Sequence, residues 1–355
     1  MASPTKTKRQ RETNVNVLRA SLLPKLARRY EANGEISLPC APSMLDHYLK
    51  TLTSTFELLG RPFSDAERAN LRKILEKHLE KGWAESPYSK LVIKYHTEPP
   101  PHPGINYTVK HVVNTIGDEY DRWVKMREPP LFGTHPDAKV VRLAAELGAP
   151  ADTPVLDVGA GTGRNTLPLA RLGYPTDAVE IAPALAEVLR KMVADEKLRV
   201  EVFEGDALDP SLPIPRGRYK LIVLAEVVAS HFRDTSQLRA LYERACELLA
   251  PGGILLFSAF VAMDGYKPDA LAKEVSQVSW CPIFSRHELE KAAEGLPLER
   301  VADECVHDYE KEFLPPEAWP PTGWFVNWSL GSDLFALGAG RAPIEMRWLS
   351  YRRRS

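Results

Sequence analysis

Apolar residues recur at helical spacing in the first third of the chain. Three stretches, 15–30, 44–59 and 64–82, place them three or four residues apart, as on the buried face of an amphipathic helix. Ser64 and Glu67 form a capping-box pattern at the start of the third stretch, and Gly82 is expected to end it. We therefore expect three amphipathic helices, each of which must bury its apolar stripe.

The chain between these helices and residue 130 is punctuated by proline. A short strand is expected at 91–95 and a further helix at 107–123, and a proline cluster at 99–103 separates them because proline continues neither element. Further prolines at 129 and 130 mark a boundary. The chain is therefore expected to have three parts: a disordered polar tail over 1–14, an N-terminal helical region over 15–130 and a second domain over 131–355.

Beyond residue 153 the pattern changes to short apolar runs separated by helical segments. Five runs are expected to be strands, at 155–158, 176–179, 200–203, 221–224 and 254–257. The first and fourth have the composition of buried parallel strands, and the third alternates apolar and polar residues. Helices are expected between them, and the alternation over 344–351 predicts a final edge strand. This part of the chain therefore alternates strands with helices.

A glycine-rich loop follows the first of these runs. Gly159, Gly161 and Gly163 form GxGxG, in which missing side chains allow a tight turn and a close approach to a ligand. Asp157 precedes the loop, and Glu180 stands at the carboxyl end of the next run. An acid about twenty residues past such a loop is where nucleotide-binding folds contact ribose hydroxyls.

Together with the LAPGGILLF pattern at 249–257, the loop and this acid resemble class I S-adenosylmethionine (SAM)-dependent methyltransferases. The loop itself is similar to that of tellurite-resistance (TehB-like) methyltransferases, without implying their acceptor. The resemblance implies a Rossmann-like α/β fold with a mostly parallel seven-stranded sheet, whose last strand inserts antiparallel. It also implies SAM as the cofactor and S-adenosylhomocysteine as its product.

The resemblance assigns the cofactor site to the loop and to the strand ends that follow it, with Asp206 and the backbone of Ala207 on the adenine. The implied cofactor-binding residues are Asp157, Gly159, Ala160, Gly161, Gly163, Asn165, Glu180, Ile181, Asp206, Ala207 and Glu226.

Two other functions remain open from the sequence. An NAD(P)-dependent oxidoreductase would show GxGxxG, but Arg164 stands where the third glycine would be. SAM has no pyrophosphate for the helix N-terminus to hold, so it does not require that glycine. The other alternative is a SAM-fold scaffold whose N-terminal helices bind a partner protein.

Methyl transfer from SAM is an in-line displacement, which requires alignment of the acceptor and, for a hydroxyl or acidic C–H acceptor, a general base. Glu226 and His231 follow the fourth run and are the candidate catalytic residues. Glu226 could equally contact the methionine part of SAM, and His231 could equally form a local hydrogen bond.

Two stretches rich in histidine and aromatic residues, 96–120 and 306–328, could form an acceptor pocket. Around Trp324 the alternative is a hydrophobic core in a terminal hairpin. The predicted acceptor-binding residues are Tyr107, His111, Tyr120, His135, His307, Tyr309 and Trp324. No metal site is predicted.

Composition and net charge limit the classes of binding partner and methyl acceptor that we expect. The formal net charge of −1 over 355 residues gives no electrostatic reason to expect nucleic acid or an anionic membrane. The absence of NPPY or DPPY after the fourth run also favours a small-molecule acceptor over adenine, cytosine or protein glutamine. Four cysteines without CxxC spacing, no apolar signal segment and no membrane-length apolar run together predict a soluble cytoplasmic protein with reduced thiols.

Overall fold

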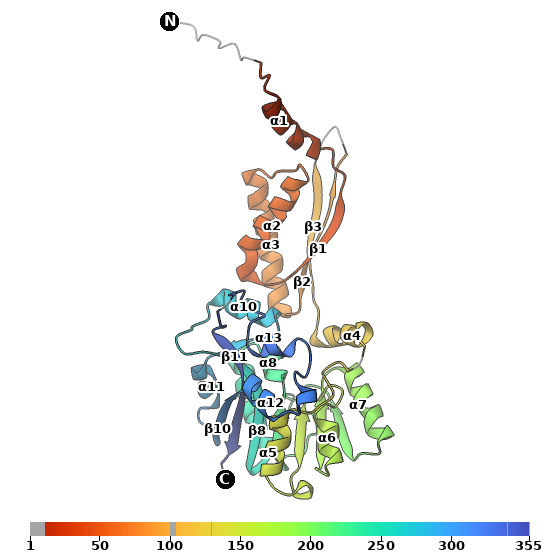
Figure 1. Ribbon diagram of the computed structural model, residues 1–355, viewed down its shortest axis with the longest axis vertical. Coiled ribbons are helices and arrows are strands. Elements are labelled where there is room, and N and C mark those ends of the chain that lie inside the picture. Colours follow the sequence, from red (N-terminus) through yellow and green to blue (C-terminus); the bar gives the residue numbers. More distant parts are fainter. Residues whose placement is uncertain (1–10, 100–103, 129, 339, 355) are drawn as a thin grey trace. The chain divides into compact units, whose positions relative to one another are not determined.

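The structure, a computed structural model, describes residues 11–99, 104–128, 130–338 and 340–354. The chain divides into two compact units between Val113 and Asn114 (Figure 1). The division falls earlier than the boundary expected near residue 130. The reason is that helix α4 (Ile116–Met126) packs against α7 (Pro183–Asp195) of the second unit. Most of the tail expected to be disordered, residues 1–10, lies outside the described residues.

The first unit combines helices with a three-stranded antiparallel sheet in the order β1-β2-β3. Its main elements are α1 (Val15–Ala27), β1 (Asn33–Pro39), α2 (Leu45–Leu58), α3 (Asp65–Glu85), β2 (Lys90–Thr97) and β3 (Ile105–Val112). The short strand expected at 91–95 is confirmed within β2, but β1 and β3 were not predicted, so the region expected to be mainly helical also contains a sheet. The helix expected over 107–123 was wrong. Strand β3 and helix α4 share that stretch, because alternate side chains of β3 face the helices while Thr115 begins a new capped helix.

Helices α2 and α3 lie along one face of this sheet (Figure 1), and Leu52, Phe56, Leu75 and Ile93 form part of the core between them. The capping box at the start of α3 is confirmed. Gly82 does not end α3. It lets the helix pass close to Cys40, since a Cβ at Gly82 would lie 2.5 Å from the Cys40 sulfur. Helix α1 departs from the expectation of a buried stripe, because none of its residues is buried.

The second unit contains one large mixed sheet in the order β10-β11-β8-β7-β4-β5-β6, with the short β9 beside β8. Its strands are β4 (Val155–Val158), β5 (Thr176–Glu180), β6 (Val200–Glu204), β7 (Tyr219–Leu224), β8 (Leu249–Ala262), β9 (Ile283–Phe284), β10 (Leu298–Cys305) and β11 (Ile344–Arg353). Strands β4 to β8 run parallel, and β11 runs antiparallel to β8. The predicted Rossmann-like fold is confirmed.

Helices cover both faces of this sheet. They are α5 (Ala138–Glu146), α6 (Thr166–Arg171), α7, α8 (Val227–His231), α9 (Thr235–Leu248), α10 (Ala270–Val278), α11 (Arg286–Ala293), α12 (Val306–Phe313) and α13 (Phe325–Ser329). Leu156 faces the core beneath α9 and α11, while its neighbour Val155 faces the core beneath α5 and α12. Side chains of successive strand residues thus pack against helices on opposite faces of the sheet.

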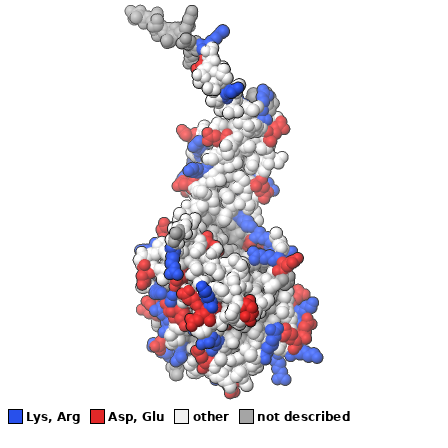
Figure 2. Space-filling view, in the orientation of Figure 1, with Lys and Arg blue, Asp and Glu red and all other residues white. Residues whose placement is uncertain are grey.

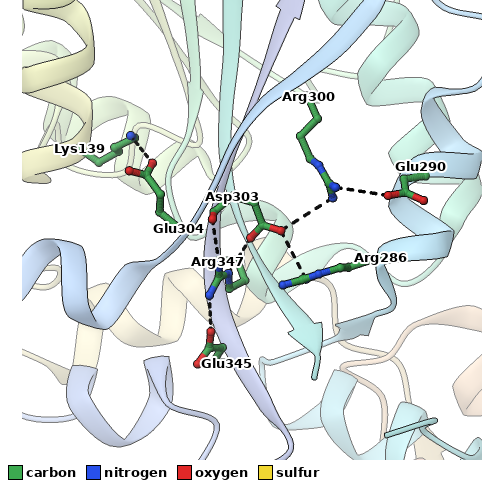
Figure 3. Close-up of polar contacts among 8 residues, drawn as sticks. All are labelled: Lys139, Arg286, Glu290, Arg300, Asp303, Glu304, Glu345 and Arg347. Atoms are coloured by element: carbon green, nitrogen blue, oxygen red, sulfur yellow. Dashed lines mark hydrogen bonds and ion pairs between the residues drawn. The ribbon is translucent and has the colours of Figure 1, made fainter. Parts of the chain in front are cut away.

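The final strand was predicted to be an edge strand, and this was wrong. Strand β11 lies between β8 and β10, so both of its edges are paired. Met346 and Trp348 are buried in the core on one face of the sheet and Leu349 in the core on the other. An ionic network crosses this part of the sheet (Figure 3): the Asp303 carboxylate lies 2.7 Å from Arg347 Nε and 3.4 Å from Arg286 Nη1. These contacts tie β10, β11 and α11 together.

Acidic and basic side chains are interspersed on the visible face of the molecule (Figure 2), in keeping with the net charge of −1. The four cysteines all carry free thiols. Within the described ranges, no helix has both the length and the apolar character needed to span a membrane.

Candidate functional site

The glycine loop connects β4 to α6 and wraps closely against its neighbours. Gly159, Gly161 and Gly163 have φ angles of 72°, 56° and 95°, in the left-handed region that side chains disfavour. A Cβ at Gly159 would lie 2.3 Å from Val227 Cγ2. The backbone N–H of Gly159 donates to the Val179 carbonyl at 2.8 Å, so the loop is fixed to the end of β5.

Glu180 links this loop to the end of β5. Its Oε2 accepts from the Gly161 N–H at 2.7 Å and its Oε1 from the Ala182 N–H at 2.8 Å. Burial raises the pKa of Glu180, and these backbone hydrogen bonds act against that rise. A carboxylate offers about four acceptor positions, so roughly two remain for the paired hydroxyls of a ribose. The loop and acid therefore fit a nucleoside such as that of SAM.

Asp157 lies beneath the loop rather than at its open side. It is buried, and its Oδ2 accepts from Thr166 Oγ1 at 2.6 Å. Burial raises its pKa to about 6. The carboxylate joins β4 to the start of α6, and a direct contact of Asp157 with a cofactor stays a prediction.

The remaining strand-end residues lie at the same edge of the sheet, because β4, β5 and β6 are neighbouring parallel strands. Asp206, just past β6, is exposed, and its Oδ1 accepts from the Leu208 N–H at 2.9 Å. Its other oxygen has no part in that hydrogen bond. Ile181 follows Glu180 and is 40% exposed, as a residue that covers an adenosine would be.

A buried ionic network beside the loop was not predicted. Arg164 Nη1 lies 2.5 Å from Asp137 Oδ1, and its Nη2 lies 2.9 Å from Glu226 Oε1. Burial alone would lower the pKa of Arg164, but Asp137 and Glu226 raise it overall. Asn165 holds Asp137 from the other side, with two hydrogen bonds of 2.9 Å. The sequence signal was Arg164 itself, at the position of the missing third glycine.

Glu226 lies two residues after β7, at the N-cap of α8, in a left-handed conformation with φ of 65°. Its N–H donates to Ser258 Oγ at 2.8 Å, which holds this strained turn. Burial raises the pKa of the Glu226 carboxyl, and Arg164 opposes that rise. The carboxylate is thus held at the edge of the sheet that carries the glycine loop.

Glu310, on α12, was also missed. It is fully buried, and it accepts from the N–H groups of Ala138 at 2.7 Å and Lys139 at 3.2 Å and from Trp348 Nε1 at 3.0 Å. It therefore caps the N-terminus of α5, whose own Asp137 makes no side-chain cap. Burial, with a further contribution from Asp137, raises its pKa to about 7.

His231 ends α8 in an aromatic environment. Its Nε2 lies 2.7 Å from Tyr120 Oη, and its ring stands edge-on to Trp280 with 5.3 Å between centroids. Burial lowers its pKa to about 3, so the imidazole is neutral at pH 7. A neutral imidazole can accept a proton, but one with this pKa is a weak base.

The other predicted acceptor residues are distributed over both units. Tyr107 and His111 belong to β3 of the first unit, where Tyr107 packs on Phe56 and His111 Nδ1 lies 2.9 Å from His78 Nδ1. His135 lies in the loop before α5, with its Nδ1 3.2 Å from Thr134 Oγ1. Among the described contacts, Tyr120 is the predicted acceptor residue that reaches a predicted catalytic residue.

The aromatic residues near the C-terminus form helices rather than the hairpin that was the alternative interpretation. Trp324 packs edge-on against Trp328, and Trp328 is buried in the core. On α12, the His307 ring lies against Trp319, and the Tyr309 ring lies 4.6 Å from Lys139 Nζ. Among the residues that the structure describes, no three His, Cys, Asp or Glu side chains are grouped to hold a metal ion.

Comparisons with known proteins agree with this geometry. Residues 155–253 match a family model described as a methyltransferase domain. An uncharacterized methyltransferase, YodH of Bacillus subtilis (strain 168), is 32% identical over 126 residues, which are 35% of this chain and 51% of YodH.

Two further relatives are named for different substrates. A demethylmenaquinone methyltransferase of Tropheryma whipplei (strain Twist) is 27% identical over 154 residues, 43% of this chain and 59% of that protein. A probable ribosomal RNA small subunit methyltransferase A of Methanosarcina mazei is 34% identical over 135 residues, 36% of this chain and 48% of that protein. The chain thus spans about half the length of the curated relatives it matches.

Proposed function

Because this chain belongs to the class I SAM-dependent methyltransferase superfamily, whose cofactor is SAM, we propose that it transfers a methyl group from SAM to a small-molecule acceptor. The observation that carries the proposal is the Glu180 carboxylate on the Gly161 N–H, at 2.7 Å, at the open edge of the parallel strands. Ligands of open α/β sheets bind at that edge.

Different residues of the site would bind different parts of the cofactor. The glycine loop, with Ala160 and Asn165, would lie along the methionine part, Glu180 would accept from the ribose hydroxyls, and Asp206 with Ala207 would hold the adenine. When bound, SAM supplies an activated methyl group for in-line displacement. The protein then has to orient the acceptor and exclude water.

Glu226 is the stronger candidate for the general base. Its carboxylate lies at the strand edge and is held by Arg164, and burial moves its pKa upward, toward neutrality. For His231 we propose a different role from that of a strong base. Its Nε2 lies 2.7 Å from the Tyr120 hydroxyl, within hydrogen-bonding distance, and the same nitrogen could orient an acceptor group.

A small-molecule acceptor is favoured by charge. A protein that binds long RNA needs several cationic phosphate contacts, whereas this chain has a net charge of −1, and acidic and basic side chains are mixed on the face that Figure 2 shows. One relative is named for a small molecule, demethylmenaquinone, and another for ribosomal RNA. The net charge of this chain favours a small-molecule acceptor over RNA. Of the acceptor residues predicted earlier, the proposal keeps Tyr120, His135, His307, Tyr309 and Trp324, which lie in the unit that carries the glycine loop.

Turnover tests the proposal directly. The full chain is incubated with methyl-labelled SAM and a fractionated extract of small metabolites, and labelled product and S-adenosylhomocysteine are both quantified. The proposal expects label in a small-molecule fraction and its loss in Glu226→Gln. Label found instead in added ribosomal RNA, or in no fraction, would contradict it. A parallel thermal-shift comparison with NADH should show no stabilisation, since a ligand that binds the folded state raises its melting temperature.

A further inference from the structure

Trp280 occupies a backbone position that normally requires glycine. It follows the C-cap of α10 with φ of 58°, its N–H donates to the Gln277 carbonyl at 3.3 Å, and the Cys281 N–H donates to the Ser276 carbonyl at 2.9 Å. These paired hydrogen bonds define a Schellman motif, whose left-handed residue is usually glycine. A bulky side chain is uncommon there, so Trp280 holds this position at a cost in backbone strain.

The indole of Trp280 belongs to a group of rings that we call the aromatic cluster: Tyr120, Trp123, Phe132, His231 and Trp280. Trp123 stacks on Trp280 with 5.0 Å between centroids and 12° between planes. Tyr120 and His231 stand edge-on to Trp280 at 5.8 and 5.3 Å. All five rings are half-buried, which distinguishes them from the fully buried core aromatics.

The aromatic cluster borders the proposed cofactor site. Phe132 covers the glycine loop, since a Cβ at Gly161 would lie 3.3 Å from its ring. Phe132 also packs near Ala182, which follows Glu180. His231 lies five residues after Glu226 on α8. A molecule that receives a methyl group at this edge of the sheet would therefore meet these rings.

The Trp280 backbone is also hydrogen-bonded to a core residue. Its carbonyl accepts from Trp328 Nε1 at 2.9 Å, and Trp328 is a buried core residue. The strained residue is thus anchored by the core, while its ring projects into the half-buried cluster. Trp123 carries a second partner, because the Arg127 guanidinium lies 3.9 Å from its ring. The Trp123 ring thus packs against two planar groups, the Trp280 indole and the Arg127 guanidinium.

We propose that the aromatic cluster is the acceptor subsite and that it selects a planar, ring-containing acceptor, which stacks on Trp280 in the place of the Trp123 ring. The inference rests on the proposed methyltransferase function. Stacking on an indole favours a flat ring over a saturated ring of the same size. The hydroxyl of Tyr120 and the neutral imidazole of His231 would contact the polar substituent of that ring.

The chain offers a matched control for Trp280. Lys197 occupies the same position after α7, with φ of 54°, and its N–H and that of Leu198 form the same pair of hydrogen bonds, to Ala194 and Val193. Lys197 is exposed and takes no part in the cluster. Both Trp280→Gly and Lys197→Gly relieve backbone strain, but only the first removes a ring.

The experiment compares two probes with the same carbon skeleton, the planar 2-naphthol and its saturated, non-planar analogue decahydro-2-naphthol. Their dissociation constants are measured by calorimetry on the full chain saturated with S-adenosylhomocysteine. Wild-type protein and Lys197→Gly are expected to bind 2-naphthol at least ten-fold more tightly than the saturated alcohol. Trp280→Gly is expected to lose that preference while its affinity for S-adenosylhomocysteine stays within two-fold of wild type.

Equal affinity of the wild type for both probes, or an unchanged preference in Trp280→Gly, would overturn the inference. If Trp280→Gly does not fold, Trp280→Phe and Trp280→Leu decide the matter: Phe should retain the preference and Leu should lose it. Failure of the wild type to bind S-adenosylhomocysteine would instead contradict the proposed function, so the two failures are distinguishable.

Discussion

Arg164 Nη2 lies 2.9 Å from Glu226 Oε1, which joins the end of the glycine loop to the carboxylate between β7 and α8. The other arm of the same guanidinium lies 2.5 Å from Asp137. One buried cation therefore neutralises two acids from different loops. This pair connects the part of the site that would hold SAM to the residue best placed to act as a base.

Replacement of Arg164 should destabilise the fold. Arg164→Met leaves Asp137 and Glu226 buried without a counter-charge, and we expect the free energy of unfolding to fall by about 3 kcal/mol. Arg164→Lys should recover little of this, since an ammonium cannot form two directed pairs. Urea denaturation measures the change. The matched control is Arg190→Met, whose exposed pair with Glu204 (2.8 Å) should contribute less than about 1 kcal/mol. Equal effects of the two Met variants would contradict the account.

Gly159 should tolerate no side chain. Gly159→Ala places a methyl group 2.3 Å from Val227 Cγ2, and we expect both a lower melting temperature and loss of SAM binding. Gly252 has a similar φ of 77°, but nothing lies within 4 Å of a Cβ placed there. Gly252→Ala should therefore show only the backbone strain, about 1 kcal/mol. Val227→Ala should partly restore Gly159→Ala, and failure to do so would remove the steric explanation.

Stability should depend on the ionisation of Glu310. Its pKa is raised from 4.5 to about 7 in the folded protein, so the folded state binds the proton more tightly than the unfolded chain. The stabilisation is therefore complete below pH 4.5 and is lost as the pH rises to about 7, by about 3 kcal/mol. Urea denaturation at several pH values should show that Glu310→Gln removes this part of the slope. An identical pH dependence in the variant would show that another group is responsible.

Much of the cofactor site follows from local sequence. A GxGxG loop, the preceding Asp157 and the later Glu180 belong to neighbouring parallel strands, so their proximity is implied once the strands are recognised. The strands of the first unit were harder to predict from the sequence. In β1 and β3 the side chains alternate only between exposed and partly buried positions, so the alternation of polar and apolar residues is weak.

The unpredicted residues depend on contacts distant in sequence. Glu310 caps a helix 172 residues earlier, and no local pattern identifies a cap supplied by another helix. Trp280 carried no signal either, because a tryptophan in a glycine position is recognised only from its φ angle. Tyr120 and His231, 111 residues apart, were each predicted but could not be paired from spacing.

Calorimetric titration of SAM into the wild type, Glu180→Ala and Glu204→Ala tests the central claim most directly. Glu180 and Glu204 are register partners at the ends of β5 and β6, but only Glu180 bonds to the glycine loop. The account predicts binding in the micromolar range, a loss of at least ten-fold in Glu180→Ala, and little change in Glu204→Ala. No binding by the wild type, or equal affinity of all three proteins, would contradict it.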